Sequence, residues 1–201
     1  MLERSPNSTV STSDNEQSKE LTLSLVQTIS KVLKNIILSQ ELSSSSAEKI
    51  NLFCLESVPS ISISDYLSRI VSYTNIETST LISSLIYIDR LCSNTNIKLS
   101  FYNIYSIISI ALYLSIKFNE DTLCKEDFYA KVAGLSMGEI AKTSLVFMKI
   151  IDYKLYISID EYKIYEQYIL KDFFANYFCL TCHDRKMWNI CEHIYFDFSV
   201  K

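Results

Sequence analysis

The chain has 201 residues, of which 48% are hydrophobic and 21% are charged, and its net charge is −4. These values are ordinary for one globular domain with a sizeable core. The acidic balance argues against a nucleic-acid partner, which would need clustered Lys and Arg. Only two Gly and two Pro occur. Because all-β folds and phosphate-binding loops need many turn glycines, this scarcity favours an all-α fold.

The first part of the chain has no pattern typical of a secretory signal. Residues 1–18 are rich in Ser, Thr, Asn and Glu, so we expect a disordered tail. The longest apolar run, Ile104 to Ile116, contains three serines and is shorter than the about 20 residues that a membrane span needs, so we expect no membrane partner. Six Cys without a framework spacing indicate reduced thiols in the cytoplasm or nucleus.

Apolar spacing and capping boxes predict where helices begin. Leu21 to Leu38 has apolar residues at helical spacing, which indicates an amphipathic helix followed by a linker within residues 19–59. Beyond a polar break, an N-cap Ser or Thr with an acid or amide three residues later recurs five times and predicts five helix starts. The pairs are Ser62 and Asp65, Thr74 and Glu77, Ser100 and Asn103, Ser136 and Glu139, and Ser158 and Glu161.

The first four of these starts, with a short helix over 125–133 that ends at Gly134, predict five helices between residues 60 and 156. A further helix from Ser158 to about Phe174 begins the extension over residues 157–201. The helix over 101–119 is apolar nearly all round, so it should lie in the middle of the domain. We expect the side chains that fill the core there to be Ile107, Ile108, Ala111 and Leu114.

Several strings in this helical stretch, at these helix positions, resemble the cyclin box, and in particular the P/U-type cyclins. The similarity runs from Ser60 to Ile169. It rests on ISISDYLSRI at 61–70, YIDRL at 87–91, LSIKFNED at 114–121, FYAKVAGLS at 128–136 and IDYKL at 151–155. The resemblance implies a single cyclin box, since no second signature follows Leu155. It also implies N- and C-terminal helical extensions around that box.

The resemblance implies a function without catalytic residues and without a cofactor. A cyclin is a regulatory subunit that packs the third and fifth helices of its box against the αC helix of a cyclin-dependent protein kinase. This contact moves the αC glutamate toward the catalytic lysine and orders the activation loop, and both are needed for phosphoryl transfer. The chain is therefore expected to be a kinase regulator and not an enzyme.

The resemblance also indicates which residues would bind the kinase. Lys117 matches the lysine that reaches backbone carbonyls of the kinase, and Phe118 and Glu120 flank it. Asp89 matches the acid of the same signature, with a structural role or an interface role both open. Many cyclins have a glutamate where this chain has Ser144, which we expect on the same face as Lys117. The neutral hydroxyl cannot make the same charge-assisted bonds, which favours the alternative of a cyclin-fold scaffold that activates no kinase.

A cluster near the C-terminus allows two interpretations. Thiolate and imidazole are the preferred zinc ligands, but the spacing of the second pair is poor, and the many aromatic residues around it favour a helix that packs on the core with Cys as a small apolar residue. Packing is the preferred interpretation, and no metal is expected. The five residues are Cys179, Cys182, His183, Cys191 and His193.

Overall fold

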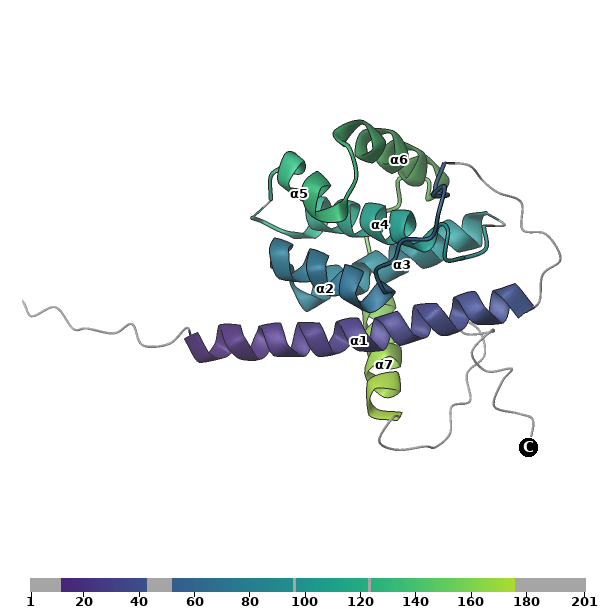
Figure 1. Ribbon diagram of the computed structural model, residues 1–201. Helices are drawn as coiled ribbons and strands as arrows, with labels where there is room; N and C mark the ends of the chain where they lie inside the picture. The colour runs from purple at the N-terminus through teal and green to yellow at the C-terminus, as the bar shows by residue number, and fades with distance from the viewer. Residues whose placement is uncertain (1–11, 43–51, 96, 123, 176–201) are drawn as a thin grey trace, which may run out of the picture.

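The computed structural model describes residues 12–42, 52–95, 97–122 and 124–175. Every regular element within these ranges is a helix, which confirms the all-α prediction (Figure 1). The five helices expected between residues 60 and 156 are present. They are α2 (Ile63–Thr74), α3 (Thr78–Asn94), α4 (Ile104–Asn119), α5 (Glu126–Ala133) and α6 (Met137–Ile150).

Two further helices flank these five: α1 (Thr12–Leu42) and α7 (Ile159–Ala175). They cross each other on the side of the molecule opposite α5 and α6, and both contact α3 (Figure 1). The bounds of α7 agree with the helix predicted after Ser158. The start of α1 does not agree, because residues 12–18 are helical where we expected a disordered tail. Once a helix is nucleated, each further residue adds a backbone hydrogen bond, so α1 continues beyond its apolar stretch toward the N-terminus.

Helix α4 is the centre of the domain, with α3 and α6 packed against it. Twelve of its sixteen residues are buried, and the four core residues predicted there are at most 5% exposed. Tyrosine hydroxyls tie other elements to it. Tyr66 on α2 donates to the Ala133 carbonyl at 2.8 Å and pairs with the Ser109 hydroxyl, and Tyr129 on α5 donates to the Ser109 carbonyl at 2.6 Å. These contacts fix α2 and α5 relative to α4.

The local capping signals are confirmed at Ser62, Ser136 and Ser158, whose hydroxyls each accept the backbone N–H three residues later. The prediction that Thr74 begins a helix is wrong. Thr74 is the last residue of α2, its hydroxyl donates to a backbone carbonyl one turn earlier, and α3 begins after Glu77. The pair at Ser100 is displaced, since α4 begins only at Ile104.

Several buried hydroxyls in the helices make their hydrogen bond to their own helix. Ser30 and Ser83 each donate to the carbonyl four residues earlier, at 2.7 and 2.8 Å. Ser115 differs, because its hydroxyl crosses from α4 to the Thr80 carbonyl on α3 at 2.7 Å. The first two therefore satisfy a polar group locally, whereas Ser115 joins two helices.

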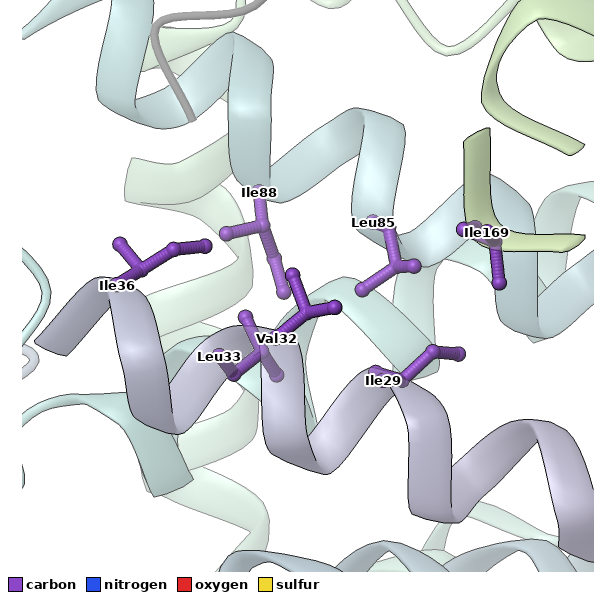
Figure 2. A pocket seen from close by; sticks show the side chains of 7 residues that line it. All are labelled: Ile29, Val32, Leu33, Ile36, Leu85, Ile88 and Ile169. Carbon is purple, nitrogen blue, oxygen red and sulfur yellow. The ribbon is translucent and has the colours of Figure 1, made fainter. Parts of the chain in front are cut away.

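A cavity of about 30 Å³ lies between α1, α3 and α7 (Figure 2). No polar side chain lines it, so it offers nothing that could orient a polar ligand, and we interpret it as a packing defect between the flanking helices and the box. The lining residues are Ile29, Val32, Leu33, Ile36, Leu85, Ile88 and Ile169.

Candidate functional site

The C-terminal end of α4 carries a three-residue polar cluster around Lys117. The side chain of Lys117 is 32% exposed, and its Nζ lies 2.9 Å from Glu126 Oε1. Tyr113, one turn earlier on α4, donates its hydroxyl to the same oxygen at 2.8 Å, and the ammonium lies 5.6 Å from the centroid of the Tyr113 ring. A cation and a hydroxyl on one face of α4 therefore share one carboxylate from the first turn of α5.

The electrostatics of this cluster follow from the shared oxygen. Hydrogen bonds from Lys117 and Tyr113 lower the pKa of Glu126. Burial, and secondarily the nearby carboxylate, raise the pKa of Tyr113 to about 12. At neutral pH Glu126 is therefore a carboxylate and Tyr113 a neutral hydroxyl donor. Sequence patterns did not indicate Glu126, because an acid in the first turn of a helix is common and nothing in its spacing names the cation it meets.

An exposed apolar side chain follows Lys117, and another lies on α6. Phe118, next to Lys117, is 51% exposed, and Leu145 on the neighbouring helix α6 is 45% exposed. Contiguous exposed apolar surface is typical of protein-binding sites, and Phe118 supplies apolar surface directly beside Lys117 in the chain. The end of α4 therefore places a cation beside an exposed aromatic side chain. That Lys117 and Phe118 bind a kinase stays a prediction.

Glu120 has a different position from the one expected. It is half-buried, and its Oε1 accepts the backbone N–H of Glu77, the N-cap residue of α3, at 2.9 Å. A carboxylate at a helix N-terminus satisfies a free backbone donor and interacts favourably with the helix dipole. Glu120 thus holds α4 to the start of α3 and has a structural role that its sequence position did not reveal.

The expectation that Ser144 lies on an exposed face is wrong. Ser144 is 6% exposed, and its hydroxyl donates to the Ile140 carbonyl at 2.5 Å. Ile140 and Phe147, one turn away in either direction, are 2% and 0% exposed. Since residues spaced by three and four lie on one face of a helix, Ser144 belongs to the core face of α6 and not to the surface.

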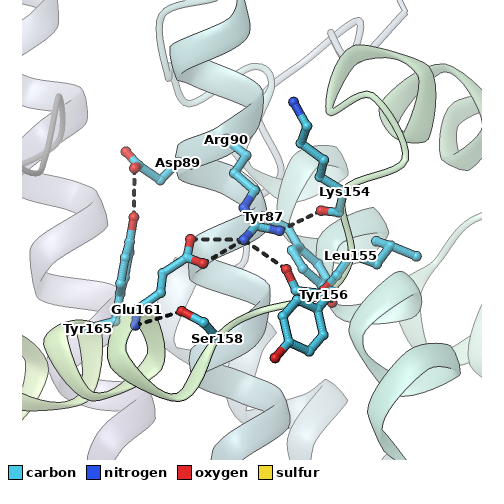
Figure 3. Close-up of polar contacts among 9 residues, drawn as sticks. All are labelled: Tyr87, Asp89, Arg90, Lys154, Leu155, Tyr156, Ser158, Glu161 and Tyr165. Carbon is cyan, nitrogen blue, oxygen red and sulfur yellow. Dashed lines mark hydrogen bonds and ion pairs between the residues drawn. The ribbon is translucent and has the colours of Figure 1, made fainter.

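Asp89 is also buried, on the side of α3 that faces α7 (Figure 3). Its Oδ2 accepts the Tyr165 hydroxyl at 2.7 Å, and within the described part of the chain Oδ1 has no hydrogen-bond partner. Burial raises the pKa of this carboxyl group. Of the two roles left open by the sequence, the geometry supports the structural one.

The neighbouring residue, Arg90, fastens the connection between α6 and α7 (Figure 3). Its Nη2 donates to both carboxylate oxygens of Glu161 at 2.9 and 2.8 Å. The same guanidinium donates to the backbone carbonyls of Lys154 at 2.5 Å and Tyr156 at 3.1 Å. A planar guanidinium with five donors suits such a cluster, so the Asp-Arg pair ties α7 to the box.

Comparison with known proteins decides the family. The family model described as "Cyclin" matches residues 1–155. The chain belongs to the cyclin family. Relatives place this cyclin with the P/U-type. It is 28% identical over 124 residues to Cyclin-U2-2 of Arabidopsis thaliana, a match that covers 61% of the chain and 54% of the relative.

Two further relatives agree with this assignment. The cyclin is 24% identical over 152 residues to Cyclin-U4-1 of Arabidopsis thaliana, covering 74% of the chain and 75% of the relative. It is 30% identical over 122 residues to the PHO85 cyclin-like protein psl1 of Schizosaccharomyces pombe, covering 59% and 50%. The chain spans about half the length of most of the curated relatives it matches.

Two sequence predictions concern a membrane span and a metal site. None of the helices in the described ranges has the length and apolar character to span a membrane. Within the same ranges, no three Cys, His, Asp or Glu side chains gather where they could hold a metal ion. The five Cys and His residues between 179 and 193 lie outside those ranges, so both interpretations of that cluster stay predictions.

The buried carboxyl group of Asp89 should make the stability of this cyclin depend on pH. Asp89→Asn tests this prediction. Because the pKa of Asp89 is raised in the folded state, that state binds more protons than the unfolded chain, and wild-type stability falls as pH rises above the unfolded pKa. The amide can still accept from Tyr165 but cannot ionise. We expect the variant to gain stability relative to wild type as pH rises from 4 to 7, by at most about 1.4 kcal/mol per pH unit.

Urea titrations at a series of pH values measure this difference. The matched control is Asp127→Asn, the same substitution at an exposed acid on α5, which should change the free energy of unfolding little. Parallel stability curves for wild type and Asp89→Asn would contradict the prediction.

Proposed function

We propose that this cyclin binds and activates a cyclin-dependent protein kinase, through the surface formed by the end of α4 and the exposed face of α6. The observation that carries the proposal is the exposed Phe118 beside Lys117, at the end of the most buried helix of the box. A rigid, central helix can hold these two side chains in a fixed place against a mobile partner helix.

For the location of this cyclin we propose the cytoplasm or the nucleus. Cys54, Cys92 and Cys124 are unpaired, which is in keeping with a reducing compartment.

The mechanism proposed for the site uses packing and a few hydrogen bonds. Phe118 and Leu145 would pack against the αC helix of the kinase and shift its position. Lys117 has three N–H donors, and with one engaged by Glu126 the others can reach backbone carbonyls of the partner. The phosphoryl-transfer chemistry would stay with the kinase.

The experiment is purification of the cyclin with its partner from native cells, followed by two measurements on purified components. Binding is measured by titration calorimetry with the recovered kinase, and activation by the rate of peptide phosphorylation with and without the cyclin. A stoichiometric complex with an increased rate supports the proposal. Recovery of no kinase, or of one that does not bind in purified form, would contradict it.

A second candidate function is a cyclin-fold scaffold that binds a partner without activating a kinase. The buried, neutral Ser144 favours it, because the carboxylate found there in many cyclins is missing. Tight binding with an unchanged phosphorylation rate in the same assay would support the scaffold.

Lys117→Ala tests the role of the lysine. Its ion pair with Glu126 is partly exposed, and such pairs contribute little to stability, so the melting temperature should change little. Kinase binding should weaken by about 2 kcal/mol if the interface desolvates the ammonium. Calorimetry with thermal melts as the folding control decides: unchanged affinity would remove Lys117 from the interface, and a loss of affinity that follows a lower melting temperature would make it a structural residue.

A further inference from the structure

We propose that Glu126 supplies the carboxylate of the kinase-binding surface in this cyclin, so that the polar clamp on the partner is built from α4 and α5 instead of α4 and α6. This inference rests on the proposed function. It goes beyond it by naming a specificity-determining residue, Glu126, and the chemistry of the partner segment that the clamp would fit.

The first argument is the sharing of a single oxygen. Glu126 Oε1 accepts both from Lys117 Nζ at 2.9 Å and from the Tyr113 hydroxyl at 2.8 Å. The phenol is held in turn by the ammonium above its ring, at 5.6 Å. A lysine side chain alone has many rotamers and loses their entropy on binding. Held between an anion and a ring, Lys117 is already positioned at the end of α4 before a partner arrives.

The second argument is that the acid has capacity left for a partner. The side chain of Glu126 is 48% exposed, and within the described ranges its Oε2 has no hydrogen-bond partner. A carboxylate has about four lone-pair positions, so this oxygen can accept from an N–H or a cation of another protein. Its place in the first turn of α5 is favourable for a negative charge even without a partner.

The third argument is that position 144 on α6 cannot supply the carboxylate. Ser144 is neutral, buried and bonded to its own helix, so α6 offers no acid there. Elsewhere near Lys117, Glu120 is engaged with the backbone of α3. Glu126 is the acid that makes the ion pair with Lys117.

The clamp predicts the chemistry of the partner segment. Lys117 would meet backbone carbonyls free of hydrogen bonds, which occur at the C-terminal end of a helix. Glu126 would meet a donor on the same segment, either a basic side chain or a free N–H, displaced toward α5. A kinase whose αC helix ends in free carbonyls, with a donor displaced toward α5, should bind this cyclin tightly. A kinase whose donor is placed to meet a carboxylate on α6 should bind it less tightly.

The test compares two substitutions that remove the same charge from adjacent residues. Glu126→Gln keeps the shape and the acceptor for Tyr113 but removes the anion, and Asp127→Asn does the same at an exposed acid one residue later. Calorimetry with the purified kinase recovered by wild type should show binding weakened by about ten-fold for Glu126→Gln and by less than about two-fold for Asp127→Asn. Thermal melts should show both variants folded.

A charge-exchanged double variant, Lys117→Glu with Glu126→Lys, separates a role toward the partner from a role within the cyclin. It keeps an internal ion pair but reverses both charges toward the kinase, so we expect binding at least as weak as that of Glu126→Gln. Recovery of wild-type affinity would overturn the inference, because the pair would then act only inside the cyclin.

The remaining outcomes distinguish the inference from the proposed function. If wild type binds the kinase and Glu126→Gln equals Asp127→Asn or binds more tightly, the inference is overturned and the proposed function stands. If wild type itself binds no kinase, the proposed function fails and the clamp falls with it.

Discussion

Ile108→Asp is expected to unfold the domain. Ile108 is 2% exposed on α4, the helix against which α3 and α6 pack. The substitution removes a large apolar side chain and places a carboxylate where no described cation lies to pair with it. Loss of the buried isoleucine costs about 2–5 kcal/mol, and burying an unpaired polar group adds about 1–3 kcal/mol or more. Together these are comparable to the whole stability of an ordinary domain.

Circular dichroism and size-exclusion chromatography measure the outcome. The matched control is Ile159→Asp, the same substitution at a residue that is 71% exposed at the start of α7. That variant should elute and melt like wild type. A folded, monodisperse Ile108→Asp protein would show that α4 is not the centre of the core.

Ser144→Glu should destabilise the cyclin instead of restoring a charged contact with the kinase. The serine lies on the core face of α6 between Ile140 and Phe147, and a side chain with three more heavy atoms would overpack that face. Its carboxyl group would be buried or would force the helix to move. We expect a loss of about 3 kcal/mol in the free energy of unfolding.

Urea denaturation compares this variant with Leu145→Glu, which adds a carboxylate at the next position, where the side chain is 45% exposed. Leu145→Glu should change stability by less than about 1 kcal/mol. Equal stability of the two variants would show that a side chain at position 144 can reach the surface, and kinase affinity should then be measured on Ser144→Glu.

The sequence predicted a helix start well where the N-cap side chain bonds a backbone group close to it in the chain. Ser62 and Ser136 each bond a backbone group three residues away, so their function needs no tertiary contact. Thr74 has the same spacing to Glu77, but Asn75 adopts a left-handed conformation (φ 49°) and ends α2 there. Two helices meet at this point, and the sequence pattern alone could not show which of them the threonine belongs to.

The candidate site was predicted less completely because helix faces depend on packing. Lys117 and Phe118 lie in the last turn of an almost entirely buried helix, so their exposure could be inferred from the end of the apolar run. For Asp89 and Ser144 the position along the helix was known but not the face. Asp89 meets Tyr165, which lies 76 residues away, and no local pattern specifies such a contact. The same limit applies to Glu126, whose partners belong to another helix.

The hydrogen bonds of the buried serines indicate which of these residues can be substituted during evolution. Ser30 and Ser83 form no polar contact with another element in the described structure, so replacing either by alanine removes one oxygen and breaks no link between helices. Such positions can drift neutrally. Ser115 is different, because its loss would leave the bond to α3 unmade. Among diverging descendants, the buried serines should therefore separate into freely exchanged and retained groups according to whether their hydrogen bond leaves the helix.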